Sequence, residues 1–594
     1  MLDNIEIISH NMVVILTILW RIAYSMITVN DHQTGRLFDP WEYLGPKRRK
    51  LLDSSWSGVF RKYLLEKLPV GKIAQYFDEV MGRPSKELYT AMGSLILQQL
   101  HDLSNPDVSM TLAFNEQWHY ALDITDESDA SIYISERTLR TYRKILIREG
   151  LDRILFETLT DTLVKAFGVD TSKQRLDSTL IRSNMRKLGR IRIFAATIRK
   201  FLKKLKRKHP DLFDTLLGSE FSDRYLGKES EGCFSQVKPS EASRTLDELA
   251  HDLLYLVELF SSYDPVQKLS EYKLLERVLH DQCLTTDTGT DTQAALKPPK
   301  EVSPDSLQNP SDPNAGYDSH KGQGYKAQIM ETYHDEKQDD TKPNLITYVD
   351  VEPAHEHDAN ALQPAIDAAQ ERDCCPEELT CDTLYGGDDN VQKAATKGVE
   401  VVAPLAGHAP KGDISLSDFT FDEKTRFVTK CPEGQEPDSV CRTRTNRLRA
   451  QFNRKTCCEC PHLKNCPVKL EKKAAFLRYD DKILRLAQRR AYEQTREFKD
   501  RYRWRAGIEG TNSHLKSDIG TERLRVRGMA SVRFAVILKA LGLNIMRCAG
   551  ALCAPLCPCF YANSGHQTSR SESFQQTLRA FHYFIVKEQI LLGY

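Results

Sequence analysis

Runs that alternate between polar and apolar residues set the fold class of this 594-residue chain. Residues 174–182, 325–333 and 345–351 read as strands, and the second run alternates at a period of two, as strands with one buried face do. Helical segments then separate two short strands, which end near Asp382 and at Ala403. Three strands followed by strands that alternate with helices predict an α/β or α+β core built on a mixed sheet.

Composition divides the rest of the chain. The predicted parts are an apolar N-terminal extension (1–35), a helical domain (36–165), core segments (170–185, 316–405 and 481–548), a helical basic insertion with a linker (186–315), a Cys- and Arg-rich insertion (406–480) and a tail (549–594). Residues 282–316 are rich in Thr, Asp, Pro and Ser, which predicts a flexible loop or linker. Ser135 is the predicted N-cap of a helix that ends near Gly150. The basic face of that helix is either an ordinary solvated face or a DNA contact.

Neither end of the chain predicts a membrane protein. The apolar run Met12–Trp20 has about half the length of a membrane helix, and Asp3 and Glu6 give it the wrong leading charge for a signal peptide. We expect a buried helix there, or a translated extension upstream of a later start such as Met26. No other segment is expected to approach membrane length. The 15 clustered cysteines are typical of reduced thiols in a cytosolic protein.

Four polar side chains share one stripe of a helix predicted over about 482–517. Tyr502, Arg505, Glu509 and Lys516 fall within an arc of about 60° at 100° per residue. The stripe is either a surface face with an i,i+4 ion pair, or a carboxylate that binds a cation while Arg505 and Lys516 hold phosphates. The basic segment 523–528 that follows favours the second interpretation.

The spacing Tyr502-x2-Arg505-x3-Glu509-x6-Lys516 resembles the Y-R-E-K signature of DDE transposases from bacterial insertion sequences. In that family, two upstream aspartates complete the site with the glutamate. The resemblance covers residues 36 to 548, approximately.

Two aspartates in strand contexts resemble the upstream pair. Asp177 in Leu-Asp-Ser-Thr looks like the first, and Asp382 in Cys-Asp-Thr-Leu-Tyr-Gly looks like the second. The segment 322–332 is similar to the strand that precedes the second aspartate. Other acids nearby have simpler expected roles. These are N-capping for Asp388 and Asp389, a structural role for Asp350, and a place beyond the stripe for Glu522.

The resemblance implies an RNase H-like catalytic core that binds two Mg²⁺ (or Mn²⁺) ions through Asp177, Asp382 and Glu509, with Asp177 shared by both ions. It implies cleavage at the transposon ends by water, then attack of the freed 3′-hydroxyl on target DNA. The expected partners are double-stranded DNA, as terminal inverted repeats and target, and a second copy of the chain. The expected location is the cytoplasm of a prokaryote, at the nucleoid.

Basic segments indicate an anionic partner, although the formal net charge is only +1. Twelve Lys or Arg and no Asp or Glu lie between Arg182 and Lys208, which is either a solvated helix face or a surface for phosphates. A second basic cluster lies within 442–455. The residues expected to contact DNA, besides Tyr502, Arg505 and Lys516, are Arg199, Lys203, Arg523 and Arg525.

Four cysteines of the second insertion form a candidate zinc site. They are Cys431, Cys457, Cys460 and Cys466. Thiolates in such a group can bind Zn²⁺ tetrahedrally, but the two-pair spacing of a zinc ribbon is missing, so partly buried reduced thiols are an equal alternative.

Two other functions stay open at this point. One is a metal-dependent nuclease that cuts DNA without joining it. The other is a domesticated or decayed copy that only binds DNA.

Overall fold

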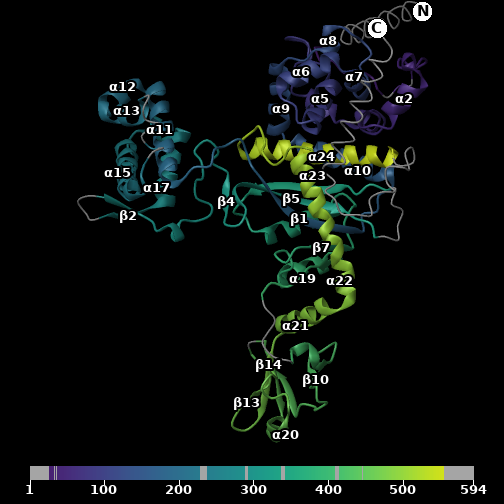
Figure 1. Cartoon of the computed structure of the whole chain (residues 1–594), viewed down its shortest axis with the longest axis vertical. Coiled ribbons are helices and arrows are strands. Elements are labelled where there is room, and N and C mark those ends of the chain that lie inside the picture. Colours follow the sequence, from purple (N-terminus) through teal and green to yellow (C-terminus); the bar gives the residue numbers. More distant parts are fainter. Residues whose placement is uncertain are drawn as a thin grey trace, which may run out of the picture.

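The strand-like runs form one mixed sheet in the computed structural model, which describes residues 26–553 except 33, 35, 228–233, 235–236, 288–291, 336–341, 408–413 and 445 (Figure 1). Its strands are β1 (Lys173–Ile181), β4 (Gly316–Asp318), β5 (Gly322–Thr332), β6 (Ile346–Pro353), β7 (Glu378–Cys381) and β8 (Glu400–Val402). The order is β6–β5–β1–β7–β8, with β4 beside the start of β5. β5 is antiparallel to β1 and β6, whereas β7 is parallel to both β1 and β8. The predicted α/β class with a mixed sheet is confirmed.

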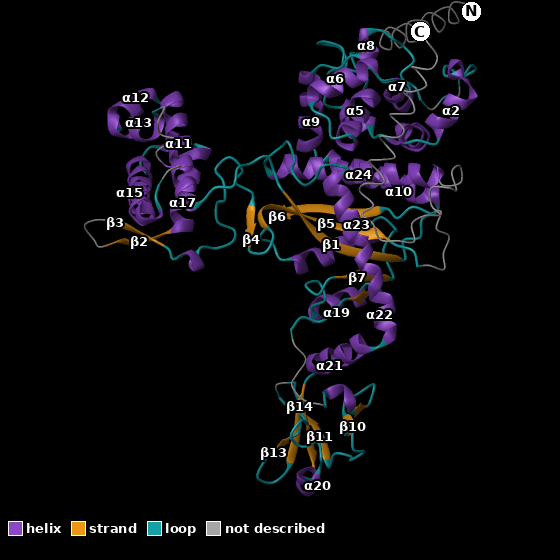
Figure 2. Cartoon of the chain, viewed as in Figure 1, coloured by secondary structure: helices purple, strands orange, loops and turns teal. Residues whose placement is uncertain are grey.

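Helices lie on both faces of this sheet (Figure 2), and each face has its own apolar core. The elements on one face are η6 (Asp358–Ala361), α18 (Leu362–Gln370) and α19 (Asp388–Thr396), and the main element on the other is α24 (Met529–Cys553). Leu176 and Met330 pack with α18, whereas Ile181 packs with α24 and the N-terminal helices. Since successive residues of a strand point to opposite faces, Asp177 faces the α24 side and Ser178 faces the α18 side.

Helices make up the region before β1. They are η1 (Glu42–Leu44), α2 (Gly45–Asp53), α3 (Trp56–Val59), the π-helical turn η2 (Phe60–Leu64), η3 (Leu65–Lys67), α4 (Val70–Ala74), α5 (Leu88–Leu100), α6 (Asn105–Phe114), α7 (Glu116–Leu122), α8 (Asp129–Ile132), α9 (Glu136–Arg148) and α10 (Leu151–Phe167). The predicted N-cap is confirmed, because the Ser135 side chain accepts a hydrogen bond from the backbone N–H of Thr138. α5 and α10 both contact α24, so these helices share a core with one face of the sheet.

α24 is long and apolar enough, by length and composition, to cross a membrane. The expectation that no segment beyond Met12–Trp20 approaches membrane length is therefore wrong. However, 67% of its most apolar window is buried inside the protein, against α5, α10 and β6, and core helices of this kind pass the same test. Met12–Trp20 itself and residues 554–594 of the predicted tail lie outside the described residues.

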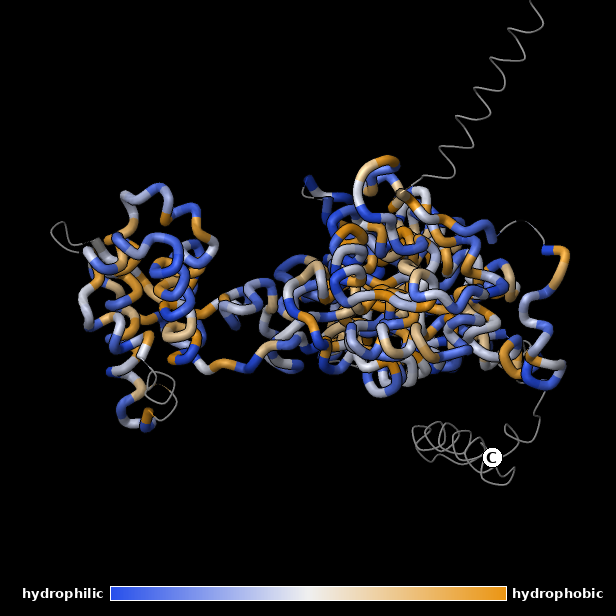
Figure 3. Tube along the Cα trace, turned by 90° about the horizontal axis from the view of Figure 1, so that it is seen from above, coloured by the Kyte–Doolittle hydropathy of each residue, from blue (hydrophilic) through white to orange (hydrophobic). Residues whose placement is uncertain are grey.

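The first insertion forms a lobe joined to the main body through a narrow connection (Figures 1 and 3). Its elements are α11 (Arg190–Lys208), α12 (Pro210–Leu216), α13 (Ser219–Leu226), η4 (Pro239–Glu241), α15 (Ala242–Phe260), α16 (Asp264–Gln267), α17 (Ser270–Gln282), β2 (Cys283–Asp287), β3 (Thr292–Leu296) and η5 (Pro299–Glu301). The interpretation of 282–316 as a flexible loop is partly wrong, because β2 and β3 pair as an antiparallel hairpin that packs on α15 and α17.

The second insertion builds a separate small sheet of order β11–β12–β14–β13. Its elements are η7 (Leu416–Asp418), β9 (Thr420–Phe421), β10 (Val428–Lys430), β11 (Ser439–Arg442), β12 (Leu448–Phe452), α20 (Arg454–Glu459), β13 (Lys469–Leu470) and β14 (Ala475–Tyr479). Leu448, Ala450 and Leu477 form its buried core.

The helix predicted over about 482–517 is broken. The observed pieces are α21 (Asp481–Gln494), α22 (Arg496–Tyr502), the 3-10 turn η8 (Arg503–Ala506) and α23 (Gly507–Ser517). The first break lies at Thr495, the N-cap of α22, whose side chain accepts a hydrogen bond from the backbone N–H of Phe498. At the second break, η8, lies the guanidinium of Arg175. It donates a hydrogen bond of 2.7 Å to the carbonyl of Trp504, and it lies where a Cβ at Gly507 would stand.

A buried ion cluster fixes α23 and α24 to the sheet. Glu331 of β5 is fully buried and accepts hydrogen bonds from Arg175 (2.7 Å), Arg547 (2.8 Å) and Thr511 (2.6 Å). Burial disfavours the charged carboxylate, but the charges of Arg547 and Arg175 outweigh this and hold the pKa of Glu331 below its ordinary value. Glu331 is therefore ionised, and its charge anchors both helices.

Replacing Glu331→Gln should destabilise the protein by about 3–5 kcal/mol, because two guanidinium groups lose the carboxylate that compensates their burial. Thermal unfolding measures the effect, with Glu136→Gln at the exposed Arg140 pair as the control. Because the pKa of Glu331 is lowered, its stabilisation is present above its ordinary pKa and is lost on acidification, so the deficit of the variant should shrink at low pH. Equal unfolding temperatures at neutral pH would contradict the assignment.

Candidate active site

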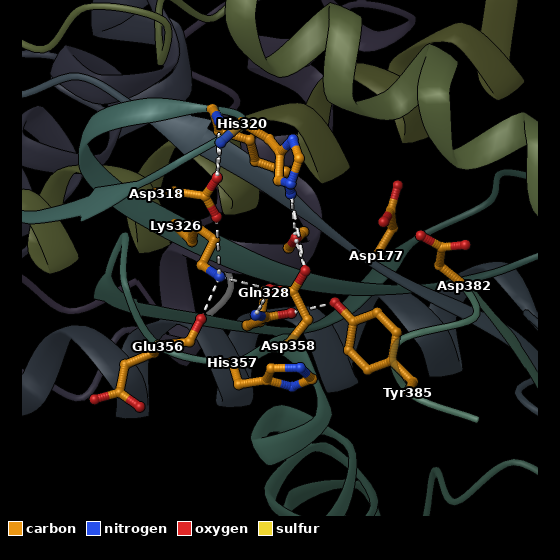
Figure 4. Close-up of polar contacts among 12 residues, drawn as sticks. Asp177, Asp318, His320, Lys326, Gln328, Glu356, His357, Asp358, Asp382 and Tyr385 are labelled. Atoms are coloured by element: carbon orange, nitrogen blue, oxygen red, sulfur yellow. Dashed lines mark hydrogen bonds and ion pairs between the residues drawn. The ribbon is translucent and has the colours of Figure 1, made fainter. Parts of the chain in front are cut away.

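The strand pairing brings Asp177 and Asp382 together. β1 and β7 run parallel, and their last paired residues are Leu176 and Cys381. The two aspartates are the next residue on each chain, so they stand side by side at the same end of the ladder (Figure 4). The two aspartates of the sequence analysis therefore lie at one end of two neighbouring strands, β1 and β7.

Asp177 lies in a largely buried position with its carboxylate directed toward the η8–α23 segment. Its side chain is 13% exposed, and its Oδ2 accepts hydrogen bonds from Arg505 (3.1 Å) and Asn512 (3.4 Å). Burial raises the pKa of Asp177 above its ordinary value, against the opposing charges of Arg505 and Lys321, and the charge of Asp382 adds to the rise. A bound cation would therefore strongly stabilise the charged form of this buried carboxylate.

Arg505 lies between two of the predicted carboxylates. One guanidinium nitrogen contacts Asp177, and the other donates to Glu509 Oε1 at 3.2 Å. Arg505 is 19% exposed, whereas Glu509 is 68% exposed. The i,i+4 pair predicted from the sequence is therefore present across the η8–α23 junction, although a continuous helix is not.

Tyr502 and Lys516 flank this group. Tyr502 stacks on Phe498 with ring centroids 5.5 Å apart, and its pKa is raised by burial and by the nearby charge of Asp382. The pKa of Lys516 is lowered by burial, and the neighbouring charges of Lys321 and Arg182 lower it further. Arg505 and Lys516 thus both lie near Asp177, which makes this side of the carboxylates a suitable surface for a phosphodiester.

Asn512 is a residue that the sequence reasoning missed. It follows Glu509 by three positions and precedes Lys516 by four, so it lies on the same face of α23. Among the described residues, its Oδ1 and the Nε of Arg505 are buried atoms without a hydrogen-bond partner. The helical spacing was a usable signal, but a neutral amide gave no reason to look.

The oxygen atoms of this site are of the chemical type that binds a hard divalent cation. Three carboxylates and the unpartnered Asn512 oxygen are ligands that Mg²⁺ or Mn²⁺ prefers. Within the described parts of the chain, no three acidic, His or Cys side chains stand close enough to hold a metal as they are oriented. Asp177 and Asp382 stand side by side. The Glu509 carboxylate is not turned toward them, because it is bound by Arg505.

The neighbouring acids have structural partners. Asp388 pairs with Arg485 at 2.6 Å and Asp389 with Lys482 at 3.2 Å, while Gly387 occupies the N-cap of α19. The N-cap prediction for these two aspartates is therefore wrong. Asp350 pairs with Arg153 and Arg533, in line with its expected structural role, and Glu522 lies 3.7 Å from Arg182.

The other residues expected to contact DNA divide into two kinds. Lys203 and Arg523 are exposed. Arg199 donates to the carbonyl of Tyr225 within the first insertion lobe, and Arg525 pairs with Asp102 at 2.9 Å. Both of these guanidinium groups have structural contacts, and their role toward DNA stays a prediction.

The four cysteines of the candidate zinc site gather beside the small sheet. Cys431, Cys457 and Cys466 pack against its apolar core. Burial raises the pKa of Cys457 to about 11, and the charges of Cys466, Cys431 and Cys460 add to this, so the thiols are neighbours. They do not form a closed metal site within the described residues, and zinc stays a prediction.

Two of the comparisons with known proteins found a similarity, one over the C-terminal part and one over most of the chain. A family model described as a transposase DDE domain matches residues 430–549, which include Glu509 and the rest of the stripe. No curated protein matches the chain. A structure of the piggyBac transposase synaptic complex with hairpin DNA is similar at 8% identity and a TM-score of 0.28, covering 88% of this chain and 79% of the other.

Replacing Arg505→Met should tighten Mn²⁺ binding to the DNA-free protein by about tenfold, since the guanidinium competes for the charges of Asp177 and Glu509. Mn²⁺ titration followed by electron paramagnetic resonance measures this. Arg501→Met is the matched control, because Arg501 also pairs with two carboxylates, Glu378 and Glu400, away from Asp177. Unchanged or weaker Mn²⁺ binding in the Arg505 variant alone would contradict the competition.

Proposed function

We propose that this chain is a DDE transposase, which cuts DNA at transposon ends and transfers the cut strand to target DNA. The single observation that carries the proposal is the position of Asp177 and Asp382 at the same end of β1 and β7, with Glu509 linked to Asp177 through Arg505. The match of residues 430–549 to a transposase DDE domain supports it independently.

The core is proposed to be RNase H-like. In support, the strand order β6–β5–β1–β7–β8 places an antiparallel meander, β1, β5 and β6, beside two strands that run parallel to β1. The first insertion lies between β1 and β4 and the second between β8 and α21, so neither changes the order of the strands in the sheet.

Asp177, Asp382 and Glu509 are proposed to hold Mg²⁺ or Mn²⁺. Bound there, divalent ions would supply an activated oxygen nucleophile and would stabilise the charge on the attacking and leaving oxygens. Asp177 and Asp382 supply charge from fixed backbone positions, whereas Glu509 joins them once Arg505 releases it. Arg505, Lys516 and Tyr502 would orient the phosphate of the DNA, which also gives Arg505 a second anion to bind.

The proposed reaction has two steps. Water attacks a phosphodiester at the transposon end, breaks the P–O3′ bond and leaves a free 3′-hydroxyl. That hydroxyl then attacks a phosphodiester of the target, forming a new P–O3′ bond as the target's own P–O3′ bond breaks. The number of ester bonds is conserved in the second step, so no external energy source is needed.

The proposed partners are terminal inverted repeats, target DNA and a second copy of the chain, in the cytoplasm of a prokaryote at the nucleoid. Lys203 and the other exposed cations of α11 would follow the DNA backbone on the first insertion lobe. A strand-transfer assay separates this proposal from a nuclease that only cuts. A cleavage assay with Mg²⁺ separates it from a copy that only binds DNA.

Replacing Asp177→Asn or Glu509→Gln should abolish cleavage of a plasmid that carries the two terminal sequences of the element, lowering the rate by at least about a thousandfold. Retardation of an end duplex in a gel should stay near the wild-type level, because neither carboxylate attracts phosphate. Asp389→Asn, at an exposed acid with a surface partner, is the control. Cleavage by either variant at the wild-type rate would exclude the site.

A structural Zn²⁺ in the second insertion is proposed as well, held by Cys431, Cys457, Cys460 and Cys466. Their mutual proximity supports it, although the thiols would have to turn toward one centre. Metal analysis of the purified protein should give one zinc per chain, and Cys460→Ser should lower that content, while Cys375→Ser should not. A zinc-free wild-type protein that is folded would leave only reduced thiols.

A further inference from the structure

A set of buried polar side chains lies beneath the two aspartates, on the opposite face of the sheet (Figure 4). We name it the Asp358 network, and its members are Ser178, Lys326, Gln328, Asp358 and Tyr385. Each side chain is at most 7% exposed. None of them belongs to the residues already proposed to bind metal or phosphate.

The members form one continuous chain of hydrogen bonds. Ser178 donates to Asp358 at 3.0 Å, and Lys326 donates to the other carboxylate oxygen at 2.9 Å. Gln328 donates to Asp358 at 3.2 Å and accepts from the hydroxyl of Tyr385 at 2.6 Å. The chain thus runs from β1, through η6 and β5, to the segment after β7.

The two ends of this chain lie next to the two aspartates. Ser178 follows Asp177 directly, and Tyr385 closes the turn that begins at Asp382, since its backbone N–H donates to the carbonyl of Asp382 at 3.1 Å. The ladder between β1 and β7 ends at Leu176 and Cys381. Asp382 therefore lies beyond the regular pairing. Its distance from Asp177 is not fixed by a backbone hydrogen bond between β1 and β7, so side-chain contacts have to fix it.

Apolar side chains would fill the space beneath the two aspartates at a lower free-energy cost than this network, so packing alone does not explain it. Burial opposes the ionisation of Asp358, but the hydrogen bond from Lys326 and the charges of Lys321 and Lys326 keep its pKa below the ordinary value. A buried ion pair is seldom more stabilising than apolar side chains of similar volume, whereas it specifies one arrangement. The neighbouring core on the same face, with Leu362 and Ile366, shows that apolar packing was available.

We propose that the Asp358 network fixes the separation of Asp177 and Asp382, with Ser178 and Tyr385 as positioning residues. This inference rests on the proposed function, because it concerns the same carboxylate pair. Two carboxylates that share a divalent cation need positions accurate to a fraction of an ångström. The network supplies this from the α18 face of the sheet, opposite the face on which the η8–α23 segment contacts Asp177.

Two hydroxyl deletions test the proposal, Tyr385→Phe and Ser178→Ala. Tyr385→Phe removes the hydrogen bond to Gln328. Ser178→Ala removes the hydrogen bond to Asp358 and the one that Lys321 donates to Ser178 at 2.8 Å. Both variants leave the ion pair of Lys326 and Asp358 intact. Tyr225→Phe is the matched control, since Tyr225 is fully buried and its hydroxyl donates to the carboxylate of Asp252 in the first insertion lobe. Thermal unfolding of all variants compares their loss of stability.

Mn²⁺ titration followed by electron paramagnetic resonance is the main readout, and the signal of Asp177→Asn is subtracted to isolate the site. The expected result is a rise of about tenfold or more in half-saturating Mn²⁺ for Tyr385→Phe and Ser178→Ala, with wild-type values for Tyr225→Phe. The Mg²⁺ dependence of plasmid cleavage should shift in the same direction, while DNA retardation stays unchanged.

The outcomes separate the two proposals. Wild-type Mn²⁺ affinity in both hydroxyl deletions, with an Asp177-dependent site in the wild type, overturns the positioning role and leaves the proposed function standing. Absence of any Asp177-dependent Mn²⁺ site and of cleavage in the wild type overturns the proposed function and this inference with it. A loss of affinity in Tyr225→Phe equal to that in Tyr385→Phe reduces the effect to stability and also overturns the inference.

Discussion

The buried charge of Asp177 in the central strand is the constraint on which the rest of the core depends. β1 lies between β5 and β7, and the side chain of Asp177 in its middle is only 13% exposed, so the carboxylate has little water and must find its compensation in the protein. Arg505 and Asn512 supply it, and both come from the η8–α23 segment. That segment has to dock at one place and in one register, and the Glu331 cluster holds it there through Thr511 and through Arg175.

The same constraint explains how two insertions are tolerated. The first leaves after β1 and returns at β4, and the second leaves after β8 and returns at α21. Neither insertion interrupts the pairing of β1 with β5 or with β7, so the residues that surround Asp177 stay in position. Each insertion has its own apolar core, with Phe201 and Leu275 in the first and Leu448 and Leu477 in the second. Their folding therefore adds surface without disturbing the site.

The sequence was informative where the signal was local and periodic. Alternating polarity located the strands, and the fixed spacing from Arg505 to Glu509 identified a contact that the structure contains. It failed where a distant residue decided the outcome. The residues between Tyr502 and Gly507 gave no sign of the turn η8, where Arg175, more than three hundred positions earlier in the chain, binds the carbonyl of Trp504. The β2–β3 hairpin was missed since its composition is that of a loop, and its stability comes from packing on α15.

The basic run that includes α11 is a second case in which distant residues decide the outcome. Twelve cations between Arg182 and Lys208 suggested one surface for phosphates, but a cation is free to bind DNA only if the fold has not used it. Arg190 binds Gln282, Lys204 lies 3.4 Å from Glu271, and Arg199 caps a carbonyl. The exposed members, such as Arg192 and Lys203, remain on the surface of the lobe. The affinity for a polyanion is thus set by which cations the tertiary structure leaves exposed, and a sum over the sequence overestimates it.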